Sequence, residues 1–191
     1  EDSDLLVGVV SRLTAQKGID LLADLVPHLA AMGVRLILVG TGEPALEARL
    51  QYLSHIFSHH FHAHIGFDTD LARRILAGSD ALAVPSRFEP CGLTQLQAMR
   101  YGTVPVVRAT GGLADTVIDP GDRALSEGEG TGIVFEHATS VGLGWAIDRT
   151  ARFKRRDPKG FVRLAKHLMK QDVSWKGPAG AYLRLFDEVC R

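Results

Sequence analysis

Residues 5–26 read LLVGVVSRLTAQKGIDLLADLV, and this stretch decides the fold. The run LLVGVV is short and almost wholly apolar, which is typical of a strand buried on both faces of a parallel sheet. A polar loop follows, and apolar residues then recur at helical spacing over 18–32, which predicts a helix. A buried strand, a loop and a helix in this order indicate the first half of a βαβ unit.

The same alternation continues along the chain. Apolar, β-branched runs predict further strands at 34–40, 81–85 and 104–107, with weaker candidates at 60–65 and 132–135. Helical patterns lie at about 43–57, 69–78, 92–101 and 140–152, and two or three helices close the chain, the last at 179–189. The polar, Gly-rich stretch 119–132 is predicted to be a loop. The class is therefore α/β: a Rossmann-like doubly wound parallel sheet of about six strands with C-terminal helices, in one domain over 1–191.

Composition narrows the classes of partner. Lys+Arg and Asp+Glu number 22 each, so no electrostatic footprint for nucleic acid or anionic membrane is expected. The basic stretch 149–159 is interpreted as a solvated helix face and turn, and no apolar run approaches the roughly 18 residues of a membrane span. Two cysteines far apart in sequence, Cys91 and Cys190, fit a reducing compartment.

Two cations follow the first predicted strand. Doubly wound sheets bind ligands beyond the carboxyl ends of their strands, so the loops at these ends are the places to search. Arg12 and Lys17 lie on such a loop, at the start of a helix, where they suit an anionic group such as a diphosphate. The alternative is a pair of solvated cations.

The stretch PSRFEPCGL, residues 85–93, follows a later strand. Its two prolines stiffen the loop and hold Glu89 in place. A helix begins near Leu93, so the amides of Gly92, Leu93 and Thr94 are expected to be unpaired donors. A fixed carboxylate beside free amides can bind a sugar hydroxyl with one and a phosphate with the other. Alternatively, Glu89 forms an ion pair with Arg87 or Arg12.

Three other segments are more ambiguous. Gly111 and Gly112 would let the backbone approach a ligand, with Asp115 in the first turn of the next helix, or they form a flexible turn. The glycines of GTGEPALE, 40–47, are a weak dinucleotide signal and suit a tight turn equally well. Five histidines over 55–64 could suggest a metal, but no carboxylate or cysteine accompanies them, so a polar connection is favoured and no metal is predicted.

These segments together resemble one family. The stretches SRLTAQKGID, GFDTDLARRILAGSDALAVPSRFEPCGLTQLQAMRYGTVPVV and TGGLADTV look like the C-terminal half of bacterial glycogen synthases and plant starch synthases. The resemblance implies the C-terminal half of a GT-B glycosyltransferase, without its N-terminal acceptor-side domain. Such enzymes transfer glucose from ADP-glucose to the non-reducing end of an α-1,4-glucan with retention, and need neither metal nor cofactor. They work in the bacterial cytoplasm, or in the plastid if the source is a plant.

The resemblance also implies roles for individual residues. Arg12 and Lys17 would neutralise the diphosphate, and Glu89 would hold the glucosyl hydroxyls and support positive charge at the anomeric carbon. Phe67 would stack on adenine. The residues implied to hold glucose and phosphate or to lie at the cleft are Cys91, Gly92, Leu93, Thr94, Thr110, Gly111 and Gly112. Arg87 is assigned to structural pairing and Phe88 to packing. Two alternatives stay open: a non-catalytic ADP- or glucan-binding module, and a transferase that uses another nucleotide-sugar.

Overall fold

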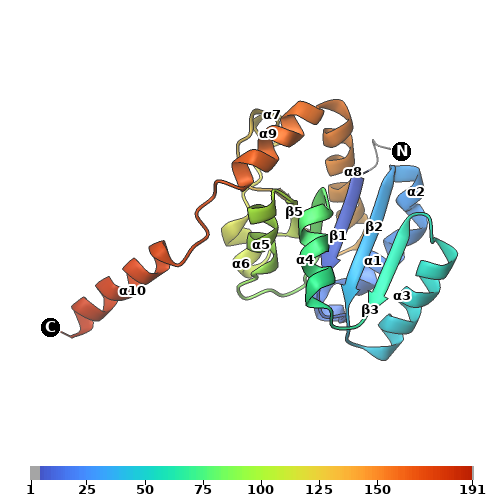
Figure 1. The fold of residues 1–191 in the computed structure, drawn as a ribbon, viewed down its shortest axis with the longest axis horizontal. Coiled ribbons are helices and arrows are strands. Elements are labelled where there is room, and N and C mark those ends of the chain that lie inside the picture. The colour runs from blue at the N-terminus through green and yellow to red at the C-terminus, as the bar shows by residue number, and fades with distance from the viewer. Residues whose placement is uncertain (1–4, 191) are drawn as a thin grey trace.

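Six apolar runs form one parallel sheet in the computed structural model, which describes residues 5–190 (Figure 1). The strands are β1 Leu5–Val10, β2 Val34–Gly40, β3 Phe61–Ile65, β4 Ala81–Val84, β5 Val104–Arg108 and β6 Ile133–Phe135. They lie in the order β3-β2-β1-β4-β5-β6, and every neighbouring pair is parallel. The doubly wound sheet and all six predicted strands are confirmed. Residues 1–4 and 191 of the expected domain lie outside the described residues.

Helices cover both faces of the sheet. Helices α1, α3 and α8 pack on one face, and α4 and α5 pack together on the other (Figure 1). The α-helices are α1 Ile19–Leu25, α2 Leu29–Met32, α3 Pro44–Ile56, α4 Thr69–Gly78, α5 Thr94–Tyr101, α6 Gly111–Thr116, α7 Asp122–Glu127, α8 Ser140–Arg156, α9 Pro158–Leu168 and α10 Lys176–Val189. Two short 3-10 helices are η1 Ala15–Lys17 and η2 Val26–His28. The single helix expected over 18–32 is thus divided, because Pro27 lacks the amide hydrogen that a continuous helix requires.

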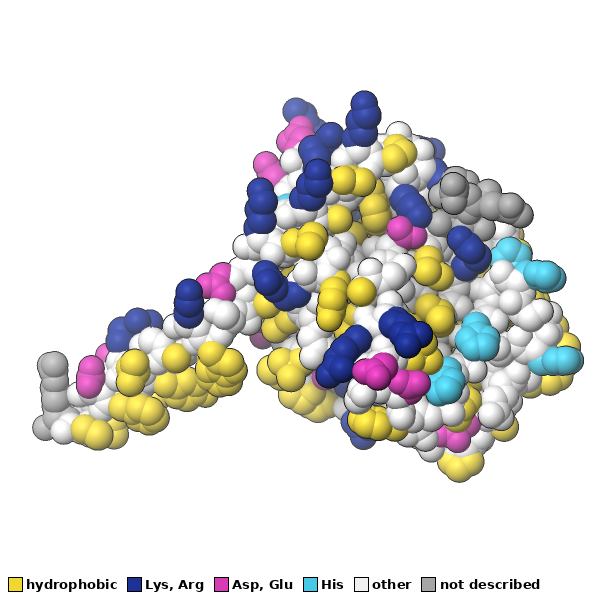
Figure 2. All heavy atoms as spheres, in the orientation of Figure 1, with side chains coloured by type: hydrophobic (Ala, Val, Ile, Leu, Met, Phe, Trp, Pro, Cys, Tyr) yellow, Lys and Arg dark blue, Asp and Glu magenta, His cyan; other side chains and the backbone are white. Residues whose placement is uncertain are grey.

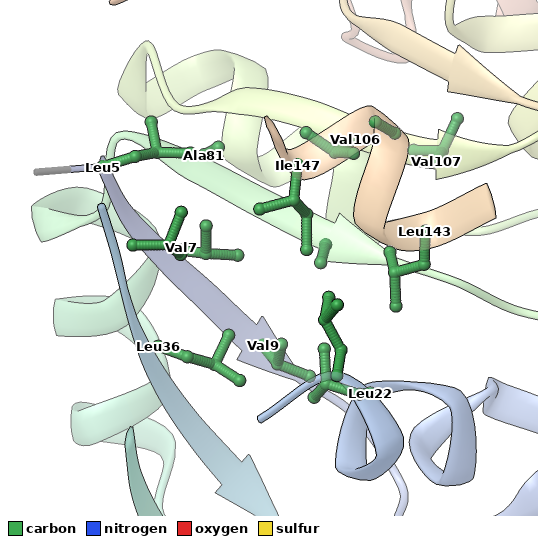
Figure 3. Close-up of a cluster of buried hydrophobic side chains, with 14 of the residues drawn as sticks. Leu5, Val7, Val9, Leu22, Leu36, Ala81, Val106, Val107, Leu143 and Ile147 are labelled. Carbon is green, nitrogen blue, oxygen red and sulfur yellow. The ribbon is translucent and has the colours of Figure 1, made fainter. Parts of the chain in front are cut away.

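The central strand shows why the sheet is buried on both sides. Leu5, Val7 and Val9 of β1 point toward α1 and α8, where they meet Leu22 and Ile147 (Figure 3). On the opposite face, a Cβ at Gly8 would lie 2.6 Å from Ile75 of α4. A bare backbone there lets α4 pack directly on the strand. Each fully buried Val, Leu or Ile contributes about 1.5–3 kcal/mol.

The stretch 119–132 is not wholly a loop, which corrects the prediction. It contains α7, and Asp119 before this helix accepts hydrogen bonds from Arg149 of α8 at 2.5 and 2.9 Å. Burial alone would raise the pKa of Asp119. Hydrogen bonds from Arg149 and from the amides of Val134 and Gly121 outweigh burial, so the pKa lies below its ordinary value of 3.8. This local polar sequence is ordered by a tertiary ion pair.

The basic stretch 149–159 is also not simply a solvated face. Arg149 additionally bonds Asp122 at 2.5 Å, and Lys154 bonds Asp80 at 2.7 Å. Arg155 donates to the carbonyl of Met32 at 3.0 Å. Three of its cations therefore tie α8 to neighbouring segments.

The last helix, α10, extends away from the rest of the molecule (Figure 1). It has no buried residue, and its hydrophobic side chains gather along one side of the helix (Figure 2). This exposed stripe includes Tyr182, Leu185, Phe186 and Val189. None of the helices in the described residues combines the length and apolar character needed to cross a lipid bilayer.

Candidate functional site

The chain reverses its direction of strand addition between β1 and β4. Strands β2 and β3 lie on one side of β1, whereas β4, β5 and β6 lie on the other. The loops that leave β1 and β4 therefore diverge at the same carboxyl edge of the sheet, where open α/β sheets bind their ligands. The first loop carries Lys17 and the second carries Glu89.

Lys17 and Glu89 meet at this edge. The Lys17 ammonium lies 2.5 Å from Oε2 of Glu89, and the Ser86 hydroxyl donates to the same oxygen at 3.0 Å. Glu89 is only 8% exposed, so its carboxylate is held in a largely water-excluded position. In the described part of the chain, its other oxygen, Oε1, accepts no hydrogen bond. The alternative pairing of Glu89 with Arg87 or Arg12 is wrong, since Lys17 is the partner.

Arg87 has the structural pairing that was predicted for it. Its guanidinium donates to both carboxylate oxygens of Asp20 in α1, at 2.6 and 2.7 Å. The hydrogen bonds from Arg87 hold the pKa of Asp20 below its ordinary value of 3.8. Phe88 was expected to pack, and this was wrong, because the ring is 60% exposed. Its backbone is fixed by its neighbours, so the side chain is free to point outward.

The segment 110–112 lies behind Glu89. The Gly112 amide donates to the Glu89 carbonyl at 3.1 Å, and a Cβ at Gly112 would lie 2.0 Å from the Cys91 carbonyl oxygen. Gly111 has φ +45° and touches the same loop. These glycines allow two backbones to pack in direct contact. Asp115 lies near the end of α6 rather than in its first turn, which corrects that prediction.

Two adjoining pockets open at this edge. The smaller, about 20 Å³, is lined by Lys17, Glu89 and Thr94, among other residues. The larger, about 190 Å³, is lined by Arg12 and Phe67 together with residues of β1, β2 and α4. Val10 and Ser11 line both pockets, so the end of β1 forms the wall between them. The Phe67 ring is 89% exposed and available for stacking.

The loop before α5 presents backbone donors. Helix α5 begins at Thr94, and among the described residues the amides of Gly92, Leu93 and Thr94 have no acceptor, as predicted. Gly92 has φ +70°, and its carbonyl accepts from the Gln95 side chain at 3.0 Å. Cys91 and Leu93 are exposed and line neither pocket. The loop is thus shaped by Gln95 and keeps its amides available for a ligand.

Some residues of the site carried no clear signal in the sequence. Ser86 bonds Glu89, and Ser11 lines both pockets. Arg108 donates from its Nε to the Ser86 carbonyl at 2.7 Å and from Nη2 to the Arg87 carbonyl. Arg108 ends β5, so a cation at a strand end was the available signal. Over residues 5–190, no group of three or more His, Cys, Asp or Glu side chains is arranged to hold a metal ion.

Comparison with known proteins agrees with this geometry. A family model described as glycosyl transferases group 1 matches residues 4–151. Glycogen synthase 1 of Rhizobium radiobacter is 47% identical over 99% of this chain and 39% of its own length. Glycogen synthase of Acidiphilium cryptum (strain JF-5) is 48% identical over 95% of this chain and 38% of its own length. The chain thus spans about two fifths of the curated relatives it matches.

A solved structure extends the comparison to three dimensions. The catalytic domain of starch synthase IV from Arabidopsis thaliana, bound to ADP and acarbose, matches all of this chain and 40% of its own, with 33% identity and a TM-score of 0.91. A match of this quality covers the sheet, the flanking helices and the loops at the carboxyl edge.

Proposed function

The chain belongs to the group 1 glycosyltransferases, and we propose that it is the nucleotide-sugar-binding domain of a glucan synthase. The complete enzyme would transfer glucose from ADP-glucose to the non-reducing end of an α-1,4-glucan with retention at the anomeric carbon. The observation that carries this proposal is the contact of Lys17 with the buried carboxylate of Glu89 at the strand-order reversal. Similarity to glycogen synthases and to a starch synthase bound to ADP supports the choice of substrates.

In this proposal, Lys17 and Arg12 bind the diphosphate of the donor. An ammonium has three donors, so Lys17 can keep its bond to Glu89 and still bind a diphosphate oxygen. Arg12 is exposed in the adjoining pocket and can reach the same diphosphate from the other side. As the bond to glucose breaks, negative charge grows on the departing ADP. Fixed positive charges stabilise this transition state more than the ground state.

In this proposal, Glu89 and the loop that follows it bind the glucosyl group of the donor. With Oε2 occupied by Lys17 and Ser86, Oε1 is the oxygen available to accept a glucosyl hydroxyl. A buried carboxylate also stabilises positive charge at the anomeric carbon more strongly than an exposed one would. The amides of Gly92 and Thr94 would donate to glucose or phosphate oxygens, with Cys91 and Leu93 shaping the rim. Thr110, Gly111 and Gly112 would support this loop from behind.

In this proposal, Phe67 contacts the nucleobase. Its exposed ring borders a pocket of about 190 Å³, and an aromatic face suffices for stacking on a nucleobase. Stacking on an aromatic ring does not by itself distinguish adenine from uracil, so ADP and UDP are compared directly in the titration below. The acceptor glucan would bind across a cleft, to residues in a part of the enzyme outside this chain.

The first experiment is calorimetric titration of the chain with ADP, UDP and maltoheptaose. We expect ADP to bind, and Lys17→Ala to weaken it about 10- to 150-fold, the range for a lost hydrogen bond between charged groups. The control variant Lys166→Ala removes an exposed lysine of α9, far from Lys17 in the sequence, and should leave the affinity for ADP unchanged. Glucan binding without ADP binding would instead favour a non-catalytic module, and tighter binding of UDP would favour a different donor.

The second experiment tests the chemistry in a complete synthase that contains this chain. Glu89→Gln keeps the shape of the side chain but removes its charge. We expect kcat to fall at least about 100-fold, the scale of removing one electrostatic contact in a transition state. A kcat that does not change would remove Glu89 from the reaction, even if ADP binding were confirmed.

A further inference from the structure

Arg87 joins the two loops that carry Lys17 and Glu89. Its Nη1 donates to the Ala15 carbonyl of η1 at 2.5 Å, and its guanidinium also grips Asp20 through both nitrogens. The Arg87 amide donates to the Gln16 carbonyl at 2.8 Å. In return, the Gln16 side chain donates to the Phe88 carbonyl at 3.3 Å. The contacts flank Lys17 on the first loop and lie directly before Glu89 on the second.

We propose that Arg87 is a positioning residue that sets the distance between Lys17 and the carboxylate of Glu89, and so the affinity for the diphosphate of the donor. This inference rests on the proposed function, because it concerns the same site. It assigns to Arg87 a role beyond stabilising the fold.

The geometry explains why an arginine is needed. A guanidinium is a planar fork that binds a carboxylate through two nitrogens and still offers a donor to a carbonyl. Here the fork holds Asp20, at the start of α1, and Ala15, at the start of η1, so Lys17 lies between its two anchor points. A lysine at position 87 would supply one point charge and could not hold both anchors in a fixed direction.

Other contacts limit the movement of these loops without replacing Arg87. Gly18 follows Lys17 with φ +69°, and a Cβ there would lie 2.1 Å from the Pro85 carbonyl oxygen. The loops therefore touch at Pro85 on one side, while Arg108 holds the carbonyls of Ser86 and Arg87 on the other. Van der Waals contact prevents the loops from moving together but not apart. Without the Arg87 side chain, among the described residues only the two hydrogen bonds of Gln16 and the Lys17–Glu89 contact would hold the loops together, and η1 would be freer to move away from Glu89.

Such a displacement of η1 would weaken the binding of the ligand. A displacement of about 1 Å in a positioning group can reduce a reaction rate about 100-fold. For binding alone, we expect Arg87→Ala to weaken ADP about tenfold, less than the loss of Lys17 itself. Because Arg87 acts through Lys17, the double variant Lys17→Ala/Arg87→Ala should bind no more weakly than Lys17→Ala. A residue that only stabilises the fold would lower Tm without changing the affinity of the folded protein.

The test is a double-mutant cycle on the chain, with ADP affinity measured by calorimetry at a temperature where each variant is folded. Asp20→Asn weakens the hydrogen bonds from the Arg87 guanidinium without truncating a side chain. It serves as a second variant in case Arg87→Ala does not fold. Arg87→Lys should fail to restore the affinity. The matched control is Arg49→Ala, since Arg49 pairs with Asp24 of the same helix α1 at 2.6 Å but touches neither loop.

The outcomes separate this inference from the proposed function. If wild-type chain binds ADP and Lys17→Ala weakens it, the proposed site stands. Equal affinity of the Arg87→Ala, Asp20→Asn and wild-type chains would then overturn only the role of Arg87. Additive losses in the double variant would also overturn it, because Arg87 would be acting independently of Lys17. A wild-type chain that does not bind ADP would overturn both proposals.

Discussion

Replacement of Asp119 by Asn should destabilise the domain strongly. Asp119 and Arg149 are 12% and 13% exposed, and Asp119 also accepts from the amides of Gly121 at 3.1 Å and Val134 at 3.0 Å. Breaking such a buried ion pair costs about 3–5 kcal/mol. Arg149 keeps its bond to Asp122, so we expect the lower end, about 3 kcal/mol, or a fall in Tm of about 6–12 °C for a domain of this size.

The assay is urea unfolding of both chains at several pH values. The pKa of Asp119 is lowered in the folded protein, so its contribution is complete above the unfolded value of 3.8 and is lost as the pH falls through the lower folded value. The difference between wild type and variant should therefore be full at neutral pH and shrink below 3.8.

A neighbouring ion pair provides the control for Asp119. Asp148→Asn breaks an exposed pair with Arg152 on the same helix, and should cost less than about 0.5 kcal/mol. A loss of under about 1 kcal/mol for Asp119→Asn at neutral pH would refute the reasoning. It would show that the pairing of Asp119 with Arg149 adds little to the stability of the fold.

Three further predictions concern the core, the loops and the base pocket. Replacement of the buried Phe161 of α9 by Ala should cost about 3–5 kcal/mol in urea unfolding, whereas Phe186→Ala on the exposed apolar side of α10 should cost less than about 0.5 kcal/mol. Similar losses would contradict the exposure of α10. Gly112→Ala places a Cβ 2.0 Å from the Cys91 carbonyl oxygen, so it should lower Tm and weaken ADP binding, and a variant with wild-type affinity would show that the loop adjusts freely. Phe67→Ala should weaken ADP about two- to tenfold, the worth of one aromatic contact, and unchanged calorimetric affinity would exclude stacking.

The strands could be predicted from the sequence because their signal is local. A strand buried on both faces must be apolar at nearly every position, and β1, β2, β4 and β5 satisfy this. Helix α7 was missed because its stability depends on a partner outside the segment. The ion pair that joins Asp119 to Arg149 spans 30 residues, and no pattern within 119–132 contains it.

In the candidate site too, some features have a local signal in the sequence and others depend on tertiary contacts. The loops could be located, because parallel strands bring their carboxyl ends to one edge of the sheet. The partner of Glu89 could not be identified, since Lys17 is 72 residues away and Arg87 is closer in sequence. Ser86 is a small residue whose importance depends entirely on the direction of its hydroxyl. Which cation pairs with which acid is decided by backbone geometry that the sequence pattern does not carry.

The wall that the end of β1 forms between the two pockets has a consequence for how such a domain could evolve. Under the proposed function, the base is bound on one side of Val10 and Ser11 and the reacting bond lies on the other. Substitutions around Phe67 could therefore change which nucleotide is accepted without disturbing the ammonium and carboxylate that handle the sugar. Under the proposed function, donor choice and transfer chemistry would depend on different residues, on the two sides of the β1 end.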